Sequence, residues 1–96
     1  MPFMSASVST TNPSRLINRL CKHFSHKIEA EWSETSGFLT FSIGECQLSS
    51  ENGALTLVCE SPTAEELEDL GKVVSSHLIR FAGEEVAEVN WQPGSA

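Results

Sequence analysis

Four short alternating segments between residues 28 and 59 constrain the fold of this chain more than any other feature of the sequence. Each segment carries apolar side chains at every second position, and the turn sequences Ser36-Gly37, Gly44 and Asn52-Gly53 separate them. A period of two is typical of strands with one buried face, and Asn-Gly is a strong hairpin signal. The pattern therefore predicts an antiparallel meander of four strands.

Two helical stripes flank the meander. Asn12-Pro13 provides an N-cap followed by proline at the first helical position, and apolar residues then recur at helical spacing, which predicts a helix over residues 13–26. The segment Thr63-Ala64-Glu65-Glu66 is a capping box at the start of a second apolar stripe, and Gly83 ends that stripe. Both helices should be amphipathic, with one side facing a core.

Alternating residues near the two ends of the chain predict two further strands, over residues 5–10 and 86–91. The order of elements is then β-α-β-β-β-β-α-β. We expect an α+β fold, a two-layer sandwich in which two helices pack on one face of an antiparallel sheet. With 96 residues the chain is too short for two cores, so residues 1–96 should form one domain with a folded core over about 5–91 and a disordered tail over 92–96.

Charge is distributed unevenly along the chain. Residues 1–28 hold four cations and no Asp or Glu, whereas the remaining residues hold two cations and all thirteen acids. The net charge of −7 argues against nucleic acid or an anionic membrane as a partner, because phosphate contacts need clustered Lys and Arg. The sequence contains no signal peptide pattern and no apolar stretch of the roughly 18 residues that span a bilayer, so we expect a cytoplasmic protein.

The three segments 20–27, 44–48 and 76–82, together with Val89-Asn90-Trp91, resemble the bacterial family catalogued as domain of unknown function 2218. The likeness covers about residues 8–91 and is specific in order and spacing. It implies a small bacterial α+β domain without an assigned activity. Some members of the family are similar to appendages of siderophore-interacting flavoproteins, and the resemblance therefore implies a link to iron handling.

All three histidines lie in the segments that carry this resemblance. His23 and His26 are three residues apart, so on a continuous helix they would project to one side, as two metal ligands do. His77 lies in the apolar stripe of the second helix, and packing of the two helices side by side would bring it toward His23 or Cys46. The candidate ligands for a divalent metal are His23, His26, His77 and Cys46.

These residues also have purely structural interpretations. Cations at the end of the first helix complement its dipole. A histidine within an apolar stripe is expected to hydrogen-bond to a backbone carbonyl or to a Glu on the sheet, and a buried thiol usually just packs. Three widely spaced cysteines without a CxxC motif indicate reduced thiols rather than a disulfide framework.

The sequence leaves several functions open. The candidate anion ligands, which could hold a carboxylate or a phosphate, are Arg19, Lys22, His23 and Lys27. We favour a non-enzymatic binding or accessory domain linked to metal or iron homeostasis. One alternative is a small enzyme using His77 with Cys46 or His23. Another is a protein-interaction module whose acidic sheet face receives a basic partner or a second copy of the chain. The acids expected on that face are Glu29, Glu31, Glu45, Glu60 and Glu88.

Overall fold

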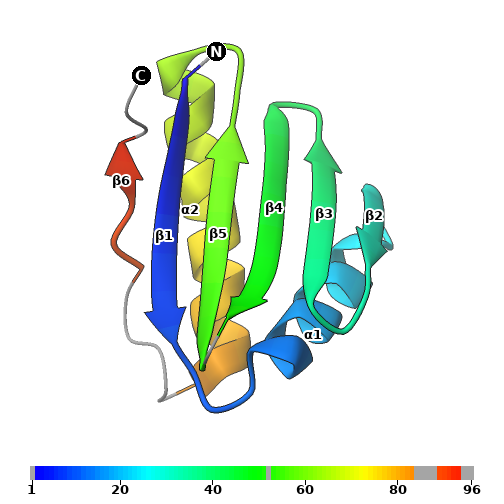
Figure 1. Cartoon of the computed structure of the whole chain (residues 1–96). Coiled ribbons are helices and arrows are strands. Elements are labelled where there is room, and N and C mark those ends of the chain that lie inside the picture. The colour runs from blue at the N-terminus through cyan, green and yellow to red at the C-terminus, as the bar shows by residue number, and fades with distance from the viewer. Residues whose placement is uncertain (1, 52, 84–88, 94–96) are drawn as a thin grey trace.

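The computed structural model describes residues 2–51, 53–83 and 89–93 of the chain (Figure 1). The elements are β1 (Phe3–Ser9), α1 (Pro13–Phe24), β2 (Glu29–Trp32), β3 (Ser36–Phe41), β4 (Gly44–Glu51), β5 (Ala54–Glu60), α2 (Ala64–Ala82) and β6 (Gln92–Pro93). The strands form one antiparallel sheet in the order β2-β3-β4-β5-β1-β6. The predicted α+β class, the order of elements and the four-strand meander are confirmed.

Both helices lie on one face of the sheet and leave the other face open (Figure 1). α1 packs on the meander strands, and α2 packs on β5, β1 and β4. Alternate side chains of each strand point to the helices, as a period of two requires. The largest side chains with almost no exposed area are Ile17, Leu20, Leu39, Leu48, Leu55, Leu57, Leu70, Val74 and Leu78. Neither α1 nor α2, the helices of the described residues, has the length and hydropathy that a membrane crossing requires.

Gly44 fixes the register at the start of β4. Its φ of +154° lies outside the range that side chains readily adopt, and a Cβ atom there would overlap the carbonyl oxygen of Glu60. Glycine therefore lets β3 turn tightly into β4 while β5 runs close by. One consequence is that Glu45 lies directly opposite Glu60 across the β4–β5 pair.

The first helix is shorter than predicted, because α1 ends at Phe24 and not at His26. The carbonyl oxygen of Phe24 accepts hydrogen bonds from the backbone N–H groups of both Lys27 and Ile28, each at 2.9 Å, and this closes a turn over residues 25–27. The turn redirects the chain into β2. His26 is consequently off the helix, and the predicted pair of ligands on one helical face is not formed.

The last strand also differs from the prediction. Residues 86–88 of the expected strand lie outside the described residues, and residues 89–91 are not in a strand. The Trp91 indole N–H donates to Ser75 Oγ at 2.7 Å, and the ring lies close to Gly71 on α2. The backbone therefore reaches β1 only at Gln92 and Pro93, two residues that the sequence pattern assigned to a tail.

Trp32, which the alternation placed on the dry face of its strand, is 39% exposed. It lies in β2, an edge strand of the sheet, which pairs only with β3 among the described strands. Its indole N–H donates to Asn18 Oδ1 of α1 at 3.0 Å. The ring therefore lies against the flank of α1 at the margin of the core.

Candidate functional site

Cationic and imidazole side chains meet where α1 packs against the C-terminal half of α2, and we call this group the basic seam: Arg15, Arg19 and His23 from α1, and His77 and Arg80 from α2. The three α1 residues follow one another at a spacing of four, which places them on one side of the helix. The Arg19 guanidinium lies over the Phe81 ring, 5.4 Å from its centroid. His23 and His77 have their ring centroids 5.1 Å apart.

Aromatic rings hold the two imidazoles in place. Phe24, which is 5% exposed, lies 4.8 Å from His77 and 5.4 Å from His23 between ring centroids. The ring centroids of Phe41, at the end of β3, and Phe24 lie 5.1 Å apart, and those of Phe81 and His23 lie 5.2 Å apart. These edge-on and tilted contacts are the geometries that aromatic pairs favour. The seam therefore rests on the core, although His23 itself is exposed.

His77 is fixed by its own helix. Its Nδ1 lies 2.8 Å from the carbonyl oxygen of Val73, which can only accept, so Nδ1 carries the proton. In the neutral imidazole this leaves Nε2 as the acceptor. The expected hydrogen bond to a backbone carbonyl is confirmed. The same bond orients the ring and leaves one nitrogen able to accept a proton or to ligate a metal.

The charges that shift the pKa of His23 are all positive. Desolvation by the side chains around it is the largest cause of its lowered pKa, and the charges of His77, Lys27, Arg80 and His26 lower that pKa further. Among the described residues, no Asp or Glu contributes a charge that raises the pKa of His23. The seam is therefore a region of positive potential on a protein of net charge −7.

The helix dipole explains only part of this arrangement. Lys22 and His23 lie in the last turn of α1, where positive charge is favourable, but Arg15 lies in the first turn, where it is not. α1 has no acid in its first turn, whereas α2 has Glu65 and Glu66 there. The positions of the cations on α1 are therefore not explained by the stability of the helix alone.

A hollow of about 250 Å³ adjoins the seam at the N-terminal end of α1. Its lining includes the side chains of Arg15, Arg19 and Phe81. Two guanidinium groups beside a concave surface are well suited to a carboxylate or a phosphate, which they can bind with paired hydrogen bonds.

The structure brings some of the predicted site residues together and separates others. Arg19, His23 and His77 meet in the seam. Lys27 and His26 lie in the turn after α1 and act on His23 through their charge, and Lys22 is exposed in the last turn of α1. Cys46 is in the core and is not part of the seam. No group of three or more His, Cys, Asp or Glu side chains within residues 2–51, 53–83 and 89–93 could hold a metal ion.

Cys46 faces Cys59 across the β4–β5 pair, and both thiols are fully buried, as is Cys21. A hydrogen bond with Cys59 and then burial raise the pKa of Cys46 well above its ordinary value, and burial raises the pKa of Cys21 to about 11. Because the thiolate is the nucleophilic form, these cysteines are poorly suited to catalysis. This argues against an enzyme that uses Cys46 with His77.

Sequence reasoning missed three members of this region: Arg15, Arg80 and Phe81. A signal for each is present in the sequence. Arg15 precedes Arg19 by four residues, and Arg80 and Phe81 follow His77 by three and four residues, so each shares a helical side with a residue that was identified. What the sequence could not show is that the two helical sides face each other.

This fold and its basic seam define a small α+β domain with a cation-lined contact between its two helices. The chain belongs to the bacterial family described as "Uncharacterized protein conserved in bacteria (DUF2218)", whose model matches residues 5–92. It is similar to PA4090 from Pseudomonas aeruginosa, a protein with an NMR structure, with 34% sequence identity and a TM-score of 0.83 over 100% of both chains. No curated protein matches the sequence. The predicted family is confirmed.

Proposed function

We propose that this protein is a non-enzymatic binding domain that holds a small anionic group, a phosphate or a carboxylate, at the basic seam. The observation that carries the proposal is the convergence of cations from both helices and the following turn on His23, where every charge that shifts its pKa is positive. A bound anion would relieve this mutual repulsion. Charge-assisted hydrogen bonds from Arg and protonated His are the usual means of holding such groups.

The seam is also preorganised for binding. Arg19 is held over Phe81, and the backbone carbonyl of Val73 fixes the ring of His77. Side chains that are already ordered lose less conformational entropy when a ligand binds. An anion whose own charge does not change with pH should bind more tightly as pH falls, because protonation of His23 adds positive charge to the seam.

A metal site is the second candidate, with the imidazoles of His23 and His77 as its two ligands among the described residues. Zinc binds imidazole nitrogen at about 2.0–2.1 Å, so two imidazoles on one tetrahedral ion have ring centroids about 5 Å apart. The His23 and His77 rings are separated by 5.1 Å. The surrounding cations, however, repel a divalent ion. A link to metal or iron homeostasis would require that the seam bind a metal ion through these two imidazoles. Metal binding should strengthen as pH rises, because it needs neutral imidazole.

The two candidates can be separated by titrating the protein with inorganic phosphate and with Zn²⁺ at about pH 5.5 and about pH 7.5, on either side of the ordinary histidine pKa. Amide chemical shifts would locate binding. Arg80→Gln removes one seam cation. Lys72→Gln is the matched control, because Lys72 is an exposed cation on the same helix that pairs with Glu68 at 3.6 Å.

We expect phosphate to shift the amides around His23 and His77. Arg80→Gln should weaken that binding by roughly threefold or more, whereas Lys72→Gln should not change it. Absence of a phosphate response would reject the anion site. Zn²⁺ binding that strengthens with pH and disappears in His23→Asn would replace it with the metal site.

A further inference from the structure

The outward side of strands β1 to β5 forms a second surface, on the face of the sheet away from the helices (Figure 1). All five acids of these strands point outward and are exposed, and we call this surface the acidic face: Glu29, Glu31, Glu45, Glu51 and Glu60. Glu88, which was expected here too, lies outside the described residues. None of the six Lys and Arg residues of the chain lies in these strands. The face therefore has no cation of its own to balance its carboxylates.

The strand register gathers three of these acids into one row across the sheet. Glu29 lies opposite Thr40, Thr40 lies opposite Glu45, and Glu45 lies opposite Glu60. Like charges directly opposite each other on neighbouring strands repel and destabilise a sheet. A cationic group placed against Glu45 and Glu60 would remove this repulsion.

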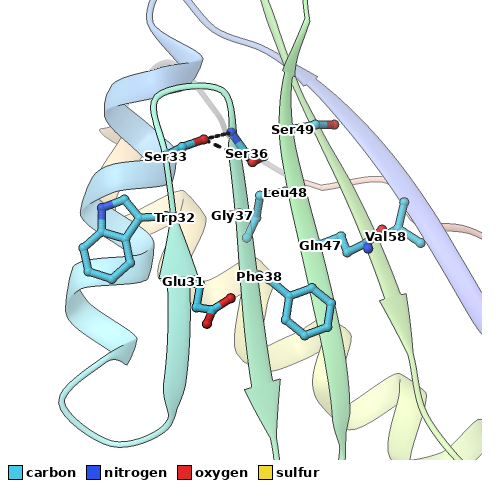
Figure 2. Close-up of a pocket in the computed structure, with 10 residues that line it drawn as sticks. All are labelled: Glu31, Trp32, Ser33, Ser36, Gly37, Phe38, Gln47, Leu48, Ser49 and Val58. Atoms are coloured by element: carbon cyan, nitrogen blue, oxygen red, sulfur yellow. Dashed lines mark hydrogen bonds between the residues drawn. The ribbon is translucent and has the colours of Figure 1, made fainter.

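A second row, next to the carboxylates, is partly apolar. Phe38, Gln47 and Val58 are neighbours on consecutive strands, and Phe38 and Val58 are half-buried. Figure 2 shows these side chains beside Glu31 on the open face. They line a shallow hollow of about 480 Å³ together with Ser49. An apolar row bordered by charge is typical of a surface that contacts another molecule.

We infer that the acidic face binds a cationic amphipathic segment of another protein, with apolar side chains over Phe38 and Val58 and Lys or Arg side chains against Glu45 and Glu60. Charge complementarity selects this partner, because nucleic acid and anionic lipid have the wrong sign. A second copy of the chain fits less well. The cations of the chain are densest on α1, but α1 exposes no apolar side chain that could enter the hollow. The exposed residues of α1 are Arg15, Asn18, Arg19, Lys22 and His23.

The test uses the whole protein and a synthetic helical peptide with leucines along one side and lysines along the other. A peptide with glutamates in place of the lysines is the control ligand. Glu45→Gln with Glu60→Gln removes charge from the acidic face at two exposed positions. Glu65→Gln with Asp69→Asn is the matched control, because both acids are exposed on α2, away from that face.

We expect the lysine peptide to shift amides of β3, β4 and β5, with an affinity that falls as salt is added. The Glu45/Glu60 double variant should bind it roughly fivefold more weakly, and the Glu65/Asp69 variant should bind it as the wild type does. Three results would overturn the inference: no binding, shifts centred on α2, or equal weakening in both double variants. Self-association of the protein alone that disappears in the Glu45/Glu60 variant would also overturn it, in favour of a second copy.

Discussion

The basic seam and the acidic face carry opposite charges and lie on opposite sides of the sheet. On the helix side, the basic seam gathers cations from α1 and α2. On the open side, five exposed carboxylates lie in strands that contain no cation. The difference shows that the net charge of −7 describes neither surface, because the fold places the cation-rich N-terminal segment and the acid-rich strands on opposite sides. Each surface is therefore suited to a partner of the opposite sign.

The largest expected effect is the difference between what the two sides of the sheet contribute to the free energy of unfolding. Two neighbouring residues of β5 test this difference. Leu57 is fully buried under the helices, whereas Val58 points to the open face. Leu57→Ala should lower the free energy of unfolding by about 2–5 kcal/mol, and Val58→Ala by less than about 1 kcal/mol. Denaturant unfolding measures both. Similar losses for the two variants would contradict the assignment of inner and outer faces.

The register of the acidic face depends on Gly44. Gly44→Ala should lower the free energy of unfolding by about 2 kcal/mol, because its backbone conformation and the Glu60 carbonyl oxygen leave no room for a side chain. Gly83→Ala should cost less, since no atom lies within 4 Å of the added Cβ although its φ is also positive. Thermal unfolding of the two variants compares them, and a larger loss for Gly83→Ala would reject this account of the turn.

Repulsion within the acidic face should be measurable in the free protein. Glu45→Gln should raise the free energy of unfolding by about 0.5 kcal/mol at low salt, since it removes the charge opposite Glu60. Glu65→Gln should have the opposite sign, because Glu65 complements the dipole at the start of α2. Both effects should shrink in salt. Destabilisation by Glu45→Gln would mean that the two carboxylates do not repel.

The positive charges of the basic seam should make the free energy of unfolding depend on pH. The folded protein lowers the pKa of His23 from 6.5, so the unfolded chain takes up this proton first. As pH falls below about 6.5 the wild type should lose stability relative to His23→Asn, until the lowered folded-state pKa is passed. Denaturant unfolding across this pH range gives the difference, which is expected to be the smallest of the four effects. A relative gain toward acid pH would contradict a positive environment.

The elements were more predictable than their ends. Alternation and turn residues are local signals, and they were sufficient for the meander and for both helices. The end of α1 depends on two hydrogen bonds to the Phe24 carbonyl, and the late start of β6 follows from Trp91 packing on α2. The exposure of Trp32 reflects the position of β2 at the sheet edge. The packing of Trp91 and the edge position of Trp32 depend on how distant segments are arranged, which a local pattern does not contain, whereas the turn after α1 is closed by local hydrogen bonds that the helical spacing did not indicate.

The candidate site was predictable to a similar degree. Burial of Cys46 on the inner face follows from alternation, and the approach of His77 to His23 required only that the helices lie side by side. The roles of Arg15 and Arg80 depend on which sides of α1 and α2 meet. That choice is made by the packing of both helices on the sheet, and no spacing within one helix determines it.

The central claim, that the basic seam holds an anion, is tested most directly by the pKa of His23 measured by NMR with and without inorganic phosphate. A bound anion favours the imidazolium, so phosphate should raise this pKa toward or above its ordinary value. The rise should be smaller in Arg80→Gln and unchanged in Lys72→Gln. A pKa of His23 that does not respond to phosphate at concentrations far above the other ions present would contradict the claim.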